Sequence, residues 1–174
     1  MSTLFVNNLN TASGSTITVP TGKKLVVTDT GGLAVPGAVI QVVNSSYSTQ
    51  TSSSSSSFAD TGLTASITPT ASSSKVLVIA QVSSCFTQTN TNTEMDVNLL
   101  RDSTTLISSF GPRGGNYTTN GDAIGTAGAV FLDSPSSTSS VTYKCQFKST
   151  QNNAQVNVHL GGTTSTMMLM EIAG

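Results

Sequence analysis

Apolar and polar residues alternate along most of this chain with the two-residue period of β-strands. The clearest segment is VTYKCQF at 141–147, whose apolar side chains all share one face. KVLVIAQVSSCF at 75–86 is apolar on both faces in its first half, which is typical of a central strand. Gly, Pro, Asn and Ser clusters separate the segments, and nothing in the pattern indicates a helix. The other segments with strand patterns are 39–43, 62–69, 94–100, 105–107, 129–132, 154–160 and 165–173.

This series of short strands predicts an all-β protein with an antiparallel jelly-roll or β-sandwich domain over residues 36–174. Val35-Pro36-Gly37 marks the expected junction with the residues before it. The preceding residues 1–35 form the second part, a short N-terminal β arm that we expect to serve as a trimerisation element.

The N-terminal part alternates like a sheet but has few side chains that could form a core. Ser13-Gly14 and Thr21-Gly22 mark tight turns between its arms. Full burial of an apolar side chain contributes roughly 1.5–3 kcal/mol, whereas ordering the backbone costs about 1–2 kcal/mol per residue. The segment is therefore either a disordered tail or is completed by other copies of the chain. We expect a homotrimer, with the arms packed around its axis through Ile17, Val19, Leu25 and Val27.

The last strand pattern, STMMLMEIA at 165–173, also suggests self-association. It is apolar on nearly both faces, whereas a sandwich strand that faces water should have one polar face. The alternatives are a central strand whose second face has no partner, or a strand that fills the sandwich with one face and meets partner chains with the other. We favour the second, with Met168 and Met170 at the trimer axis, because methionine tolerates irregular packing.

Composition excludes several classes of partner. The 174-residue chain has 9% charged residues and a formal net charge of −1, which gives no electrostatic reason to bind nucleic acid or an anionic membrane. No apolar run approaches the ~20 residues of a membrane helix, and the start, MSTLFVNNLN, lacks the pattern of a secretory signal. We therefore expect assembly in the cytosol, with both cysteines kept as thiols.

Few residues could support catalysis. A nucleophilic pair of His159 with Cys85 or Cys145 is disfavoured, because Cys145 shares an apolar strand face that should point into the core. Glu94 and Asp96 lie on one strand face and could serve glycoside hydrolysis or hold calcium, but a solvated outer face is the simpler interpretation. We predict no catalytic residues, no cofactor and no metal site, and hence no enzyme.

Two loop-like segments remain. The serine run between Tyr47 and Phe58 is expected to be structural, as an exposed loop or a polar edge strand. Residues 111–128 are expected to form a long loop rich in Gly and Asn. Within this loop, RGGNYTTNGD has the residue types of an adaptable interface. The alternatives are plain turn chemistry or contact with a binding partner through Arg113, Asn116, Tyr117 and Asp122.

Several segments resemble fibre and surface proteins of tailed bacteriophages, especially phages of marine bacteria and cyanobacteria. They are NTASGSTITVPTGKKLVVTDTGGL followed by VPGAVIQVV, then FADTGLTASITPTASSSKVLV, and the ending LMEIAG. The resemblance covers most of the chain and implies a homotrimer with a jelly-roll domain, built into a tail fibre or onto the capsid surface.

The expected function is therefore that of a virion structural protein assembled in the cytoplasm of a bacterial host, with residues 1–35 as its virion anchor. Because only about three dozen residues precede the sandwich, we favour a capsid-decoration (cement or head-fibre) protein that binds itself and the major capsid protein or another virion protein. The alternative is a short tail-fibre tip that binds a host surface glycan. A carbohydrate-active enzyme is a remote third possibility.

Overall fold

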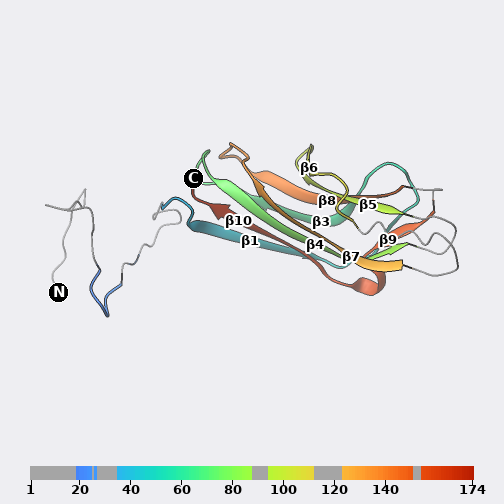
Figure 1. Ribbon diagram of the computed structural model, residues 1–174, viewed down its shortest axis with the longest axis horizontal. Coiled ribbons are helices and arrows are strands. Elements are labelled where there is room, and N and C mark those ends of the chain that lie inside the picture. The colour runs from blue at the N-terminus through green and yellow to red at the C-terminus, as the bar shows by residue number, and fades with distance from the viewer. Residues whose placement is uncertain (1–18, 25, 27–34, 88–93, 112–122, 151–153) are drawn as a thin grey trace.

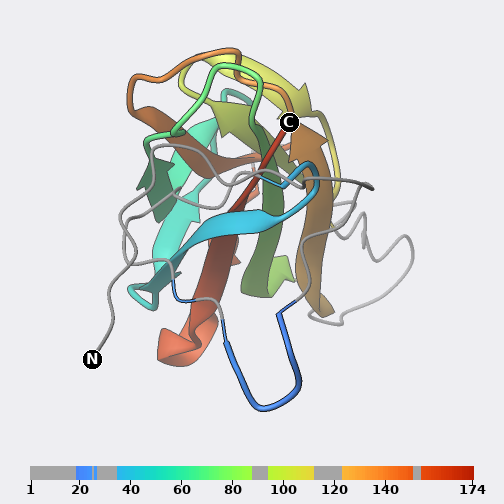
Figure 2. The same cartoon turned by 90° about the vertical axis from the view of Figure 1, so that its left-hand side faces the viewer.

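The computed structural model describes residues 19–24, 26, 35–87, 94–111, 123–150 and 154–174. These residues form two antiparallel β-sheets that face each other across an apolar core (Figures 1 and 2). The only helical element within the described part is the single 3₁₀ turn η1 (Leu160–Gly162). Among the described residues, no helix is long and apolar enough to cross a membrane.

Sheet A has six strands. The order β1-β10-β4 forms its main body, β7 pairs with β4 on the other side, and β9 and β2 continue the sheet beyond the end of β10. Its strands are β1 (Val39–Tyr47), β2 (Thr51–Ser53), β4 (Lys75–Thr87), β7 (Ala123–Asp133), β9 (Val156–Val158) and β10 (Ser165–Ile172).

Sheet B has four strands in the order β3-β8-β5-β6. They are β3 (Ala59–Ile67), β5 (Met95–Arg101), β6 (Thr104–Ile107) and β8 (Val141–Ser149). When the short strands β2 and β9 are set aside, each sheet has four strands, in the orders β1-β10-β4-β7 and β3-β8-β5-β6. This exchange of successive strands between two sheets is the topology of a jelly roll, so the predicted fold class is confirmed.

The core forms because inward and outward side chains alternate along each long strand. In β8, Val141, Tyr143, Cys145 and Phe147 are all buried, as the sequence pattern predicted. The strand β4 is central, with β10 on one side and β7 on the other, as its pattern predicted.

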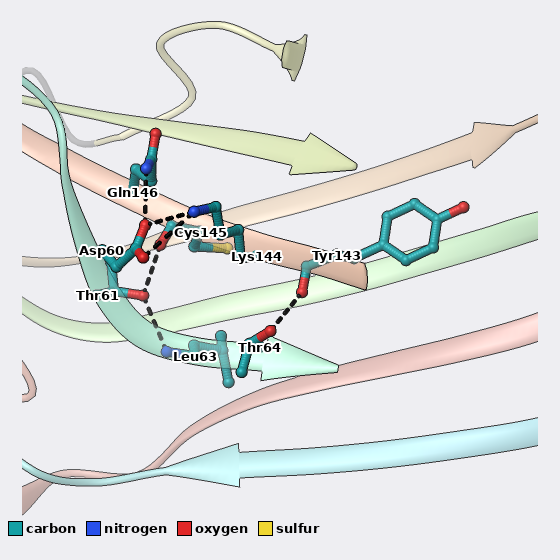
Figure 3. A network of polar contacts seen from close by, with 8 residues as sticks. All are labelled: Asp60, Thr61, Leu63, Thr64, Tyr143, Lys144, Cys145 and Gln146. Atoms are coloured by element: carbon teal, nitrogen blue, oxygen red, sulfur yellow. Dashed lines mark hydrogen bonds and ion pairs between the residues drawn. The ribbon is translucent and has the colours of Figure 1, made fainter. Parts of the chain in front are cut away.

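A β-bulge in β3 fixes how the two sheets meet. The pairing of β3 with β8 shifts register between Asp60 and Thr64. The Thr61 hydroxyl donates a hydrogen bond to the carbonyl of Cys145 (2.9 Å) and accepts one from the Leu63 amide (3.1 Å), which replaces the interrupted ladder (Figure 3). Gly62 in the bulge has φ +93°, and a Cβ there would lie 2.3 Å from the Tyr47 ring of β1. Glycine therefore allows Tyr47 to pack across the two sheets.

Two strand predictions were wrong in detail, and one open alternative was decided. Residues 123–128 belong to β7 rather than to a loop, because their backbone pairs with that of β4. The serine run contributes the short strand β2, which pairs with β9 at the end of the sheet, and this agrees with the edge-strand alternative. The strand expected over 154–160 is limited to β9, because His159 has the left-handed backbone conformation (φ 59°) and begins the 3₁₀ turn.

The described residues before β1 contain two turns. The Lys23 amide donates to the Pro20 carbonyl (3.0 Å) and Gly22 has φ +78°, which confirms the turn predicted at Thr21-Gly22. The second turn joins Ala38 N to Val35 O (2.9 Å). Gly37 in this turn donates to the carbonyl of Ala173 (2.8 Å), so the start of the sandwich is attached to the end of the chain.

Candidate interaction surface

The outer face of sheet B is polar. Lys144 lies 3.0 Å from an oxygen of Asp60, and the Gln146 amide donates to the same carboxylate over 2.7 Å (Figure 3). Burial opposes ionisation of Asp60, but the hydrogen bonds from Gln146 and Lys144 outweigh it and lower its pKa. On the same face Ser66 bonds Thr142 over 2.8 Å. These interactions suit a surface that faces water.

The outer face of sheet A is apolar instead. The pairing register places residues of β1, β10, β4 and β7 side by side in rows that cross the sheet. One row is Val42, Met170, Leu77 and Leu132, and the next is Asn44, Met168, Ile79 and Val130. We call the apolar members of these two rows the sheet A patch: Val42, Leu77, Ile79, Val130, Leu132, Met168 and Met170.

The patch is open to solvent in the single chain. Val130 is 68% exposed and Val42 is 54% exposed, while Met168 and Met170 are partly buried between their neighbours. A further row, Ser46, Thr166, Gln81 and Gly128, borders the patch with uncharged polar or small residues. Lys75 borders the opposite end, beside Ile172.

The predicted axis residues are only partly within the described part of the chain. Met168 and Met170 lie on the outer face of β10, while Met167 and Leu169 fill the core, as the two-sided pattern predicted. Val19 is exposed (46%). The remaining predicted residues, Ile17, Leu25 and Val27 of the arms and Arg113, Asn116, Tyr117 and Asp122 of the loop, lie outside the described residues. Their assignments and the division at residue 35 stay predictions.

Five members of the patch were missed from the sequence: Val42, Leu77, Ile79, Val130 and Leu132. A signal was present for two of the strands, because 75–79 and 129–132 are apolar on both faces. Alternation could show that such a strand has two apolar faces. It could not show that these faces line up across four strands.

The cysteines have the properties of core residues. Cys85 and Cys145 are both buried, and the prediction that Cys145 faces the core is confirmed. Burial raises the pKa of Cys85 to about 11 and that of Cys145 to about 12. Because the thiolate is the nucleophile, these thiols are poorly suited to attack a substrate.

His159 is fully buried rather than presented to solvent. Its Nδ1 lies 3.1 Å from the Thr49 carbonyl, and its ring packs edge-on against Tyr47 with the centroids 5.3 Å apart. Burial lowers the pKa of His159, which favours the neutral ring, although the hydrogen bond to Thr49 opposes this shift. A neutral ring that donates from Nδ1 is held in place by β1 and the segment after it, as a structural histidine would be.

The buried carboxylates connect elements of the sandwich. Asp133 of β7 accepts hydrogen bonds from Arg101 (2.6 Å) and from the Tyr143 hydroxyl (2.7 Å), which ties sheet A to sheet B. Asp96 of the predicted pair with Glu94 accepts from Ser109 over 2.6 Å and lies 3.9 Å from Lys148. Asp96 is half-buried rather than fully solvated. Among the described residues, no group of three or more His, Cys, Asp or Glu side chains is placed to hold a metal ion.

Comparisons with known proteins found distant likenesses of structure. No family model and no curated protein matches the chain. The solved structures with a similar fold include the infectious bursal disease virus VP2 subviral particle, with 18% identity and a TM-score of 0.43 over 77% of this chain and 33% of that one. Another is the Gt strain of the same virus, with 16% identity and a TM-score of 0.39 over 77% and 33%. The chain thus spans about a third of the length of these proteins, and values this low assign neither a family nor a function.

Proposed function

We propose that this chain is a non-enzymatic structural protein of a tailed-phage virion, displayed as a homotrimer on the capsid surface. In this proposal residues 1–35 anchor the protein and the jelly roll is its outward body. The observation that carries the proposal is a jelly roll with a core of its own, one polar outer face and one uncharged apolar outer face. The apolar outer face of such a body is suited to contact other protein surfaces.

The fold is compatible with this role but does not establish it, because jelly rolls occur in viral capsid proteins, lectins and cupins alike. The distribution of reactive groups supports a structural role. The thiols are buried with raised pKa values, the histidine is buried, and Asp133 and Glu171 accept several hydrogen bonds from their neighbours. These groups hold the sandwich together.

Two further observations support an anchored virion protein. The sequence resemblance to phage fibre and surface proteins includes the segment before the sandwich, which has too few apolar residues to fold alone. The turn at Gly37 is attached to Ala173, so β1 begins at a defined end of the sandwich (Figure 1). An anchor leaving from that end would hold the body with its long axis away from the shell.

The proposal is tested by co-sedimentation with bare phage capsids. Full-length protein and a variant of residues 36–174 are mixed with capsids at low and high salt, and the protein that sediments with the shell is measured. We expect the full-length chain to bind at both salt concentrations, because a segment with few charges binds by backbone pairing and small apolar contacts that salt screens little. The variant should stay in the supernatant.

Equal binding of both proteins would refute the anchor. The loop that carries Arg113 and Tyr117 would then be the better candidate for attachment. Absence of binding by the full-length chain to capsids, together with binding to host cell-surface polysaccharide, would instead favour the tail-fibre tip.

A further inference from the structure

The sheet A patch is unusual because it forms the middle of the broader face of the sandwich and contains no charge. Three adjacent rows across β1, β10, β4 and β7, including the bordering row, contain no Asp, Glu, Lys or Arg. The charged residues of these strands lie elsewhere: Glu171 and Asp133 point inward and are buried, and Lys75 lies at the end of the face. Sheet B, by contrast, has Asp60 and Lys144 on its outer face.

We infer that the sheet A patch is the contact surface between copies of this chain, with three such faces turned toward a common threefold axis. This inference deepens the proposed homotrimer and assigns the contact to the sandwich itself. The occupant of the patch is therefore the same patch of two further copies.

The absence of charge supports a second copy as the occupant. Around a symmetry axis each residue approaches its own equivalents. A charged residue would then meet a like charge, which is unfavourable, whereas Ile79 or Met168 meets another apolar side chain. A face that bound a different protein would have no such restriction.

Three copies of a face of this width fit around a common axis. With strands about 4.8 Å apart, four strands form a face about 20 Å wide, and three such faces arranged as a triangular prism lie about 6 Å from the axis. Side chains between packed sheets fill about 5 Å on each side, half of the ~10 Å sheet spacing. The side chains of the patch would therefore nearly fill the space at the axis, and methionines such as Met168 and Met170 can adapt to what remains.

The patch has the size of the apolar centre of an interface, not of its whole area. Its two rows, about 20 Å by about 14 Å, cover roughly 280 Å², which is about a third of the ~800 Å² that each partner contributes to a standard interface. Stable interfaces consist of an apolar centre within a polar rim. Asn44, Thr166 and Gln81 stand beside the apolar residues as such a rim.

The test is the oligomeric state of the full-length chain in sedimentation equilibrium. Wild-type protein should have the mass of three copies of the 17.8 kDa chain at micromolar concentration. A variant with Ile79→Lys and Val130→Lys places two cations per copy near the axis. Its association should weaken by at least about 100-fold, because each apolar side chain contributes about tenfold or more.

The matched control is a variant with Thr64→Lys and Ser66→Lys, which places the same charges on the exposed outer face of sheet B. It should associate like the wild type. Circular dichroism and thermal unfolding confirm that each variant is folded. The single variant Val130→Lys, at a position that is 68% exposed in the chain, gives a milder change that does not threaten folding.

Three outcomes would overturn the inference. They are a wild-type monomer up to about millimolar concentration, a dimer instead of a trimer, or equal association of the two double variants. If the wild type is monomeric but Ile79→Lys with Val130→Lys abolishes co-sedimentation with capsids, the patch faces the shell. The self-contact is then wrong while the proposed virion role stands.

Discussion

Glu171 is a fully buried carboxylate that neutral groups hold in place. The Gln41 amide donates to one of its oxygens over 2.6 Å, and the amide and hydroxyl of Thr70 both donate to the other over 2.7 Å. Burial opposes ionisation, but these hydrogen bonds outweigh it and lower the pKa of Glu171. A single side chain thus joins β10, β1 and the segment after β3.

Replacing this carboxylate should destabilise the sandwich. In Glu171→Gln the charge is lost and an amide NH₂ faces groups that are themselves donors, so we expect the free energy of unfolding to fall by about 2 kcal/mol. Urea unfolding at neutral pH measures the change. The control is Asp60→Asn, the same substitution at a solvent-exposed carboxylate, which should stay within about 0.5 kcal/mol of the wild type. Equal effects of the two substitutions would contradict the role given to Glu171.

His159 should make the free energy of unfolding depend on pH between pH 7 and pH 5.5. Because its pKa is lowered in the folded protein, the unfolded chain takes up a proton first as the pH falls below about 6.5. The free energy of unfolding should therefore decrease from pH 7 to pH 5.5, by at most about 1.4 kcal/mol per pH unit. Glu171 contributes a separate loss only below about pH 4.5, where the unfolded chain begins to bind protons in preference to the folded one.

The substitution His159→Asn separates these two ranges. Asparagine tolerates the left-handed backbone conformation of this position, and its amide can donate to the Thr49 carbonyl. The urea midpoint of the variant should be constant between pH 7 and pH 5.5, while its loss below pH 4.5 remains. A wild-type midpoint that does not change down to pH 5.5 would show that His159 titrates alike in both states.

Gly62 shows how one residue determines packing between sheets. In Gly62→Ala the new methyl group would overlap the Tyr47 ring and strain a backbone with φ +93°. We expect a loss of at least about 2 kcal/mol in the free energy of unfolding. In the control Gly128→Ala, nothing lies within 4 Å of the added Cβ, and its effect should be small. The two urea midpoints measure the difference, and similar midpoints would mean that Tyr47 can move aside at little cost.

At the scale of elements, alternation predicted the strands whose core residues are large. The strands β4, β8 and β10 were found close to their observed bounds because one or both faces are apolar. The first half of β7 was missed because Gly and Ala have little strand propensity. Its small residues follow β4 only through long-range pairing, as between Ala127 and Val82. The end of β9 was missed because the backbone of His159 leaves the β region.

Neither the order of the strands nor the continuity of the sheet A patch could be predicted from the sequence, and the reason is the same for both. Pairing β1 with β10 joins residues about 130 positions apart, and local patterns carry no information on such partners. The sequence showed that β10 has two apolar faces. The position of Met168 and Ile79 in one row became visible only with the register.

At the scale of the whole molecule, the residues that form the core are separate in sequence from the N-terminal residues that we expect to take part in assembly. Among the described residues, every member of the buried core lies after position 60, and the first core-packed strand begins at Val39. Within the described residues before β1, Val19 and Val26 are exposed and no strand is present. The sandwich therefore has its own source of stability.

This separation predicts the behaviour of a chain of residues 36–174. It loses the turn bond between Ala38 and Val35, worth about 1 kcal/mol, and keeps the hydrogen bonds that join Gly37 and Ala38 to Ala173. We therefore expect its free energy of unfolding to lie within about 1 kcal/mol of the value for the full-length chain. Because the sheet A patch is intact, the truncated chain should still sediment as a trimer. A folded but monomeric truncated chain would show that the arms, through Ile17, Val19, Leu25 and Val27, hold the copies together instead of the sandwich.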